Sequence, residues 1–200
     1  MKIICADNSN TLYNNEPADT FIKEGEPLVY FRPDSSILKN GKPFFLPDYF
    51  ERITVTPGLV FMIERLGKGI PEKFAGRYWS RITVGTAFTA IGAENISIAT
   101  GFDQSLSIGN FTELEESCTT DFSFSINGEE VCKKCIGNYI GQANRIIARI
   151  SNYCTLKTGD LVFIGTPTNQ LSGHECLTAE IGMRLSGNLG RNTVMDFYIR

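Results

Sequence analysis

A Cys-x-x-Cys motif, Cys132-Lys133-Lys134-Cys135, has a spacing that could support redox or metal chemistry. Neighbouring lysines lower the pKa of a thiol, as a redox site requires. A zinc site needs a second pair of ligands, and no such pair stands at a usable spacing. A thioredoxin-like motif follows a strand and opens a helix within a βαβ pattern, which this sequence lacks. We therefore interpret the motif as a coincidence of spacing.

His174 is the one histidine of the chain and stands in the polar segment 172–175, Ser-Gly-His-Glu. A serine or cysteine hydrolase needs a base held against its nucleophile and an acid that orients the base. The sequence contains no nucleophile elbow, no P-loop and no dinucleotide-binding fingerprint. We interpret His174 as an exposed loop residue.

Segment 158–167, Thr-Gly-Asp-Leu-Val-Phe-Ile-Gly-Thr-Pro, combines a polar turn, a buried strand and a tight turn of small residues. Glycine permits close approach of the backbone, and the hydroxyl and amides at Thr166 suit a small anionic ligand. Taken alone, the segment is explained more simply by a structural turn.

The composition is that of one globular domain of 200 residues: 42% of them are hydrophobic and 20% are charged. The net charge of −3 provides no basic surface for nucleic acid or anionic lipid. No apolar run reaches the roughly 18–20 residues that span a bilayer, and Asp7 interrupts the apolar opening before a signal-peptide core can form. Six cysteines are too few for a disulfide scaffold. We expect a cytoplasmic protein that binds neither nucleic acid nor membranes.

Short apolar runs rich in β-branched and aromatic residues predict strands along most of the chain. Prolines bound the run at 27–33, which favours an edge strand. Asn40-Gly41, between 37–38 and 44–46, predicts a hairpin. We expect a turn or bulge at Pro57-Gly58, because proline cannot donate to the ladder. Further strands are expected at 2–5, 52–56, 59–63, 82–91, 161–164, 177–185 and 193–199.

A second hairpin and one helix complete the expected elements. Apolar and polar residues alternate over 121–126, and Asn127-Gly128 then turns the chain into 129–131. Apolar residues at helical spacing predict a helix over 138–153. The chain is therefore expected to be α+β and mainly β, with antiparallel or mixed sheets.

Several segments, in the same order, resemble the fumarylacetoacetate hydrolase family (its C-terminal catalytic domain and its single-domain bacterial relatives). Segment 158–167 resembles the family's Gly-Asp … Gly-Thr-Pro signature, and 126–129 (Ile-Asn-Gly-Glu) resembles its Val-Asn-Gly-Glu turn. Segment 31–36 is similar to a Phe-Lys-Pro-x-Ser segment, 2–5 to the opening strand and 101–103 to a Lys-x-Phe-Asp run. The resemblance implies a rolled β-sandwich with mixed sheets and few helices. It also implies one domain over 1–200, with 1–25 as a short segment or lid remnant, and a homodimer.

The resemblance also implies metal-assisted cleavage, decarboxylation or tautomerisation of β-diketo and 2-keto acids. In the family, Mg²⁺ or Mn²⁺ is held by three carboxylates, two of them in a Glu-x-Glu on one strand and the third on the next strand. Thr56, Gly58 and Ala87 stand at these positions here. Without anionic ligands, nothing compensates the dehydration of the cation. We therefore expect no metal and no other cofactor.

The other charged groups of the family's centre are replaced as well. The family lysine falls at Thr100, and its two histidines fall at Thr54 and at about Tyr13. Nearby acids do not restore a Glu-x-Glu, because none has an acidic partner two residues away; these acids are Glu51, Glu64 and Glu94.

Three hypotheses follow from these replacements. The leading one is a pseudoenzyme, a family member with lost or altered activity that binds a small carboxylic acid. The second is an active hydrolase, isomerase or decarboxylase with non-standard ligands or no metal, in which Asp103 acts as the base after burial raises its pKa. The third is a structural partner of an intact paralogue. The residues expected to line the pocket are Thr56, Gly58, Ala87, Thr100, Asp103, Gly165 and Thr166.

Overall fold

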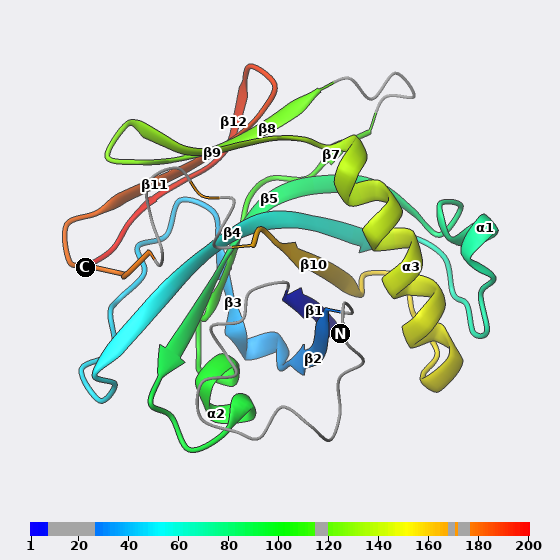
Figure 1. Cartoon of the computed structure of the whole chain (residues 1–200), viewed down its shortest axis with the longest axis horizontal. Helices are drawn as coiled ribbons and strands as arrows, with labels where there is room; N and C mark the ends of the chain where they lie inside the picture. Colours follow the sequence, from blue (N-terminus) through cyan, green and yellow to red (C-terminus); the bar gives the residue numbers. More distant parts are fainter. Residues whose placement is uncertain (8–26, 115–119, 168–170, 172–176) are drawn as a thin grey trace.

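Two β-sheets of different size form most of the computed structural model, which describes residues 1–7, 27–114, 120–167, 171 and 177–200 (Figure 1). Within these residues the large sheet has eight strands in the order β2-β1-β10-β4-β5-β6-β3, with β7 beside β5. The strands β1 and β10 pair in parallel, as do β3 and β6, so the sheet is mixed. Its strands are β1 (Ile3–Asp7), β2 (Leu28–Arg32), β3 (Ile37–Lys39), β4 (Arg52–Ile63), β5 (Trp79–Ile91), β6 (Leu106–Ile108), β7 (Thr112–Glu113) and β10 (Leu161–Gly165).

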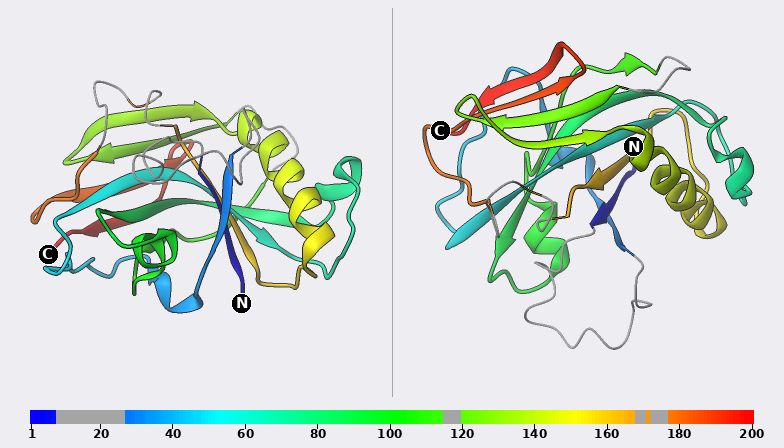
Figure 2. Two further views of the ribbon diagram at one scale, coloured as in Figure 1. Left: turned by 60° about the horizontal axis from the view of Figure 1, so that its bottom comes forward. Right: turned by 45° about the horizontal axis from the view of Figure 1, so that its top comes forward.

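The small sheet has four strands among the described residues, in the order β12-β11-β8-β9, and Figure 2 shows it as a layer beside the long strands β4 and β5. The two sheets touch closely: a Cβ built on Gly187 of β11 would lie 2.6 Å from Val84 Cγ1 of β5. The expected fold class, mainly β with mixed sheets and few helices, is confirmed. The remaining elements are β8 (Asp121–Ile126), β9 (Glu129–Cys135), β11 (Arg184–Leu189), β12 (Asn192–Tyr198), α1 (Glu72–Ala75), α2 (Ile96–Gly101) and α3 (Gly137–Tyr153).

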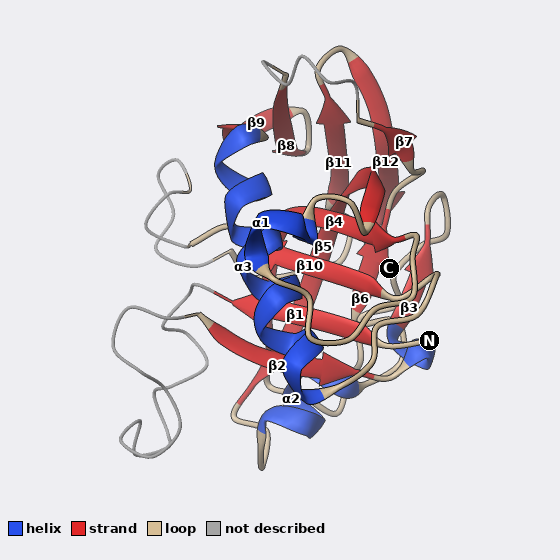
Figure 3. Ribbon diagram, turned by 90° about the vertical axis from the view of Figure 1, so that its right-hand side faces the viewer, coloured by secondary structure: helices blue, strands red, loops and turns tan. Residues whose placement is uncertain are grey.

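The two faces of the large sheet bury separate hydrophobic clusters, because side chains alternate along each strand. On β10, Val162 and Ile164 belong to the larger cluster, which α3 and the small sheet cover. Figure 3 shows α3 crossing the large sheet beside β10 and β1. The smaller cluster consists of Ile3, Cys5, Tyr30, Val60, Ala87, Leu106, Leu161 and Phe163. No described helix is both long and apolar enough to cross a membrane.

Most of the predicted elements are confirmed. β2 is an edge strand of the large sheet, α3 covers the predicted helix, and β10 ends at the predicted tight turn. The hairpin β8–β9 turns at Asn127 and Gly128, whose φ values of 52° and 87° match the left-handed turn that this dipeptide favours.

The turn or bulge predicted at Pro57-Gly58 is wrong, because β4 continues through it for 12 residues. Residues on both sides of Pro57 stay in register with β5. Thr166, one residue beyond the end of β10, donates its backbone N–H to Pro57 O over 2.8 Å. Pro57 therefore lies where the ladder with β10 stops, which is where the missing N–H of proline costs least.

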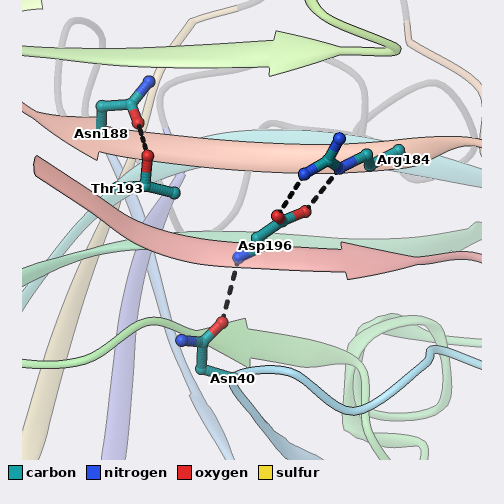
Figure 4. Close-up of polar contacts among 5 residues, drawn as sticks. All are labelled: Asn40, Arg184, Asn188, Thr193 and Asp196. Carbon is teal, nitrogen blue, oxygen red and sulfur yellow. Dashed lines mark hydrogen bonds and ion pairs between the residues drawn. The ribbon is translucent and has the colours of Figure 1, made fainter.

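The hairpin predicted at Asn40-Gly41 is also wrong. The chain does turn there, with Gly41 at φ 77°, but the two arms do not pair. β3 pairs instead with β6, and Phe44 forms an isolated bridge with Ile199. Figure 4 shows that Asn40 Oδ1 accepts the backbone N–H of Asp196 on β12 (3.0 Å), so the turn is tied to the small sheet.

The strand predicted at 177–185 is wrong over most of its length, since β11 begins only at Arg184. Gly182 adopts φ 93° just before it, in the left-handed region, which interrupts an extended strand. The final strand, β12, agrees with the prediction at 193–199. The short helices α1 and α2 were not predicted, because four and six residues carry too little periodicity.

Candidate functional site

Four of the predicted pocket residues lie side by side on the large sheet. Thr56 is the register partner of Ala87 on β5, and Gly58 is the register partner of Gly165 on β10. A Cβ built on Gly165 would lie 3.1 Å from Thr56 Cγ2. All four residues are buried. The positions that the resemblance assigns to metal ligands thus meet at one place, on the face that carries the smaller cluster.

The residues at this place do not fit a hard divalent cation. They supply one hydroxyl and no carboxylate, whereas Mg²⁺ and Mn²⁺ need several oxygen ligands, of which carboxylates carry the charge. At Gly58 a Cβ would overlap Ile164 O, so the backbone of β10 fills the space that a side chain would need. Within the described ranges, no three His, Cys, Asp or Glu side chains are grouped so that they could hold a metal ion.

Thr166 lies next to these four residues, but its hydroxyl points to the opposite face of the large sheet. Its Oγ1 lies 2.9 Å from the Tyr139 hydroxyl and 4.0 Å from Cys132 Sγ, both in the larger cluster on the opposite face. Burial raises the pKa of Tyr139 to about 12, so this phenol is neutral at pH 7. Only the backbone of Thr166 contributes to the candidate site.

The Cys-x-x-Cys motif lies on β9, and no thiol of the described part of the chain forms a disulfide with it. A spacing of three on a strand places Cys132 and Cys135 on opposite faces, and both are free cysteines. Burial raises the pKa of Cys132, which disfavours a reactive thiolate. Both observations agree with our interpretation of the motif as a coincidence.

Asp103 does not lie with the four adjacent residues of the large sheet. Asp103 follows α2 in an exposed turn, so the burial that a base role would require is absent. Thr100 is fully buried in α2, where its hydroxyl donates to Ile96 O, and its carbonyl faces Arg32. His174 and Tyr13 lie outside the described residues.

Arg32 is a site residue that the sequence interpretation missed. Its side chain is buried, with 3% of the residue exposed, and reaches across the smaller cluster to the residue after Ala87. Its Nη1 donates to the carbonyls of Phe88 (3.2 Å), Thr100 (2.7 Å) and Ser105 (2.8 Å), and to Ser105 Oγ (2.9 Å). Two sequence signals are present: a charged residue at the end of an apolar strand, and the similarity of 31–36 to the family's Phe-Lys-Pro-x-Ser segment, in which Arg32 takes the place of the lysine.

Two buried titratable groups, Cys5 and Tyr30, adjoin this guanidinium, and Asp7 lies on the same face of β1 as Cys5. Nη2 of Arg32 donates to the Tyr30 hydroxyl over 3.3 Å, and the thiol of Cys5 adjoins the guanidinium. Burial raises the pKa of Cys5 to about 11 and raises that of Tyr30 further above its usual value. Both groups are therefore neutral at pH 7. Asp7, also missed, is buried at 6% exposure.

Asp160, from the Gly-Asp of segment 158–167, lies at the other end of β10 and is fully partnered. Its carboxylate accepts the backbone N–H groups of Lys2 (2.7 Å) and Lys157 (2.8 Å) and pairs with Lys2 Nζ (2.6 Å). Burial opposes the charge, but these hydrogen bonds outweigh it and hold the pKa of Asp160 below its usual value. This aspartate fastens β1 to β10 and is a structural residue.

Comparison with known proteins gives the family and the fold. A model of the fumarylacetoacetate (FAA) hydrolase C-terminal domain matches residues 4–190. An uncharacterised protein of Archaeoglobus fulgidus is 24% identical over 150 residues, which span 71% of this chain but only 59% of that protein. The mitochondrial oxaloacetate tautomerase FAHD1 of Arabidopsis thaliana is 24% identical over 177 residues, 83% of this chain and 78% of the relative.

A solved structure shares the fold. Fumarylpyruvate hydrolase from Pseudomonas aeruginosa, crystallised with Mn²⁺ and pyruvate, superimposes with a TM-score of 0.77 at 19% identity, over 100% of this chain and 89% of that one. The resemblance that the sequence motifs indicated is confirmed. Because the family model covers nearly the whole chain and a solved member has the same fold, this chain belongs to the fumarylacetoacetate hydrolase family.

Proposed function

We propose that this chain is a family member whose metal-dependent chemistry is lost or altered and that it binds a small carboxylic acid without a metal ion. The family relation and the fold support the binding of a small acid, and the residues at the expected ligand positions support the loss of the metal ion.

The observation that carries this proposal is the composition of the sheet at Thr56, Gly58 and Ala87. The three positions are adjacent, as ligands of one ion would be, yet they provide a single hydroxyl oxygen. Moreover, no side chain fits at 58 without displacing Ile164 O of β10. Loss of three carboxylates removes the charge that compensates dehydration of Mg²⁺ or Mn²⁺.

Calorimetric titration of the full chain with Mn²⁺ and with Mg²⁺ tests the proposal. We expect no saturable heat up to millimolar metal, and binding of pyruvate that is unchanged by a chelator. Micromolar affinity for either ion, or pyruvate binding that requires the ion, would overturn the proposal.

A second candidate is an active enzyme on keto acids. It is supported by the names of relatives, among them oxaloacetate tautomerases of Arabidopsis thaliana and Escherichia coli. Turnover of oxaloacetate or an acylpyruvate, measured with and without Mg²⁺, distinguishes the two candidates. Turnover that Asp103→Asn abolishes and Asp34→Asn does not would favour the enzyme, because both aspartates are exposed.

A further inference from the structure

The guanidinium of Arg32 has one saturated side and one side with unused donors. Nη1 makes all of its contacts with the carbonyls and hydroxyl named above, which fix the plane of the group. On the other side, Nη2 has one long contact, 3.3 Å to the Tyr30 hydroxyl, and the buried Nε has no hydrogen-bond partner. The neutral Cys5 thiol adjoins the guanidinium, but sulfur is only a weak acceptor. The Nε–Nη2 side is one of the two sides through which arginine binds a carboxylate with two parallel hydrogen bonds.

The positive charge of Arg32 also lacks a counter-charge among the described residues. No acidic side chain there lies within ion-pair distance of the guanidinium. Cys5 and Tyr30 are neutral at pH 7, so they provide no negative charge. A buried charge without a counter-ion is unfavourable, and an anion that enters removes this penalty.

The Tyr30 hydroxyl is arranged to assist such an anion. Its oxygen accepts from Nη2, and its own hydrogen faces only the Cys5 thiol, which is a weak acceptor. Together, Nε, Nη2 and the phenol O–H offer three donors to a planar group with two oxygens.

We propose that the Nε–Nη2 side of Arg32, with the Tyr30 hydroxyl, binds the carboxylate of a small organic acid. This inference rests on the proposed function, since the guanidinium supplies the positive charge that a metal ion would otherwise provide. The arginine fork binds carboxylate and phosphate alike, and we choose a monocarboxylate because its single negative charge balances the single positive charge of Arg32.

The test observes Arg32 directly in the full chain. In ¹⁵N-labelled protein with a chelator present, we expect the Arg32 Nε–Hε signal, assigned by its loss in Arg32→Lys, to shift saturably with sodium pyruvate and with sodium acetate. Sodium chloride at the same ionic strength should leave it unchanged. Tyr30→Phe keeps the Nη1 contacts and removes one donor, so it should weaken pyruvate binding by about fivefold to tenfold. The control Tyr153→Phe, at a residue 78% exposed, should not change the affinity.

The outcomes separate this inference from the proposed function. If pyruvate binds without metal while the Arg32 signal stays in place, or if Tyr30→Phe binds as tightly as the parent, only the assignment to Arg32 fails. If pyruvate binds only in the presence of Mn²⁺, both fail. A signal that shifts with phosphate but not with acetate or pyruvate would overturn the carboxylate assignment. If Arg32→Lys does not fold, the affinity ratio of Tyr30→Phe to Tyr153→Phe decides.

Discussion

Asp160 and Arg32 are both buried charged residues, but their surroundings compensate the charge very differently. Asp160 receives two backbone N–H groups and the ammonium of Lys2. Arg32 is surrounded by neutral carbonyls, hydroxyls and a thiol, and one of its nitrogens has no acceptor. The difference indicates that Asp160, although it belongs to the retained Gly-Asp signature, stabilises the fold. The charge of Arg32 has no counter-ion, so an anionic ligand would be favoured there.

The largest expected effect is the loss of stability when Arg32 is replaced, because its guanidinium donates to the carbonyls around it. Arg32→Met leaves the carbonyls of Phe88, Thr100 and Ser105 without their donor, so the free energy of unfolding should fall by about 3–5 kcal/mol. Urea denaturation measures this loss. Arg81→Met, which removes a half-buried ion pair with Glu64, is the matched control and should lower the free energy of unfolding by no more than about 1 kcal/mol. Equal effects of the two changes would mean that Arg32 is not an internal clamp.

The contribution of Asp160 to the free energy of unfolding should depend on pH, unlike that of Arg32. Asp160→Asn should lower the free energy of unfolding by about 2–3 kcal/mol at pH 7, because a charged acceptor of three donors is lost. Since the pKa is lowered on folding, this contribution is complete above the unfolded value of about 3.9 and is lost as the pH falls through the lower folded value. Denaturation curves at a series of pH values should therefore show parent and variant converging only in acid. A constant difference down to the acid limit would contradict the ion pair.

A third comparison concerns Gly58, which lies on β4 of the large sheet. Gly58→Ala places a Cβ against Ile164 O, so we expect a loss of about 1–3 kcal/mol from overpacking. The control Gly141→Ala lies on α3 with nothing within 4 Å of the added Cβ, and it should be neutral or slightly stabilising. Thermal unfolding compares the two. If Gly58→Ala were as stable as Gly141→Ala, the space for a ligand at 58 would exist after all.

The smallest effect concerns the hydroxyl of Thr166. Tyr139→Phe removes its 2.9 Å partner and should cost about 1 kcal/mol. The neutral phenol is favoured in the folded state, so this stability is present below pH 10 and is lost between the unfolded value of about 10 and the folded value of about 12. Alkaline unfolding followed by absorbance measures it, and Tyr153→Phe serves as the exposed control. A wild-type Tyr139 that ionises near pH 10 would show that the phenol is not buried, because burial is what raises its pKa.

Two Asn-Gly turns show how much of the fold local sequence determines. Asn127-Gly128 joins two strands that pair with each other, and the alternating pattern of 121–126 made this predictable. Asn40-Gly41 carries the same dipeptide, but β3 is only three residues long and pairs with β6, some 70 positions further along the chain. A turn signal fixes the turn, and the partner of each arm depends on long-range pairing that one sequence does not reveal.

The candidate site was predictable only in part. Thr56, Gly58, Ala87 and Gly165, which the resemblance placed in one pocket, are adjacent in the structure, and their role as pocket residues stays a prediction. Arg32 was not predictable, because its carbonyl partners at 88, 100 and 105 carry no side-chain signature. Asp103 matched a family motif, yet its exposure depends on how α2 ends.

The central claim is that the positions of the family's metal ligands hold no metal here. The most direct test is a crystal of the full chain grown with millimolar Mn²⁺ and pyruvate, with diffraction data collected at the manganese absorption edge. We expect no anomalous peak near Thr56, Gly58 and Ala87, and density for the acid against Arg32. An anomalous peak at the sheet, coordinated by side chains of this chain, would contradict the account.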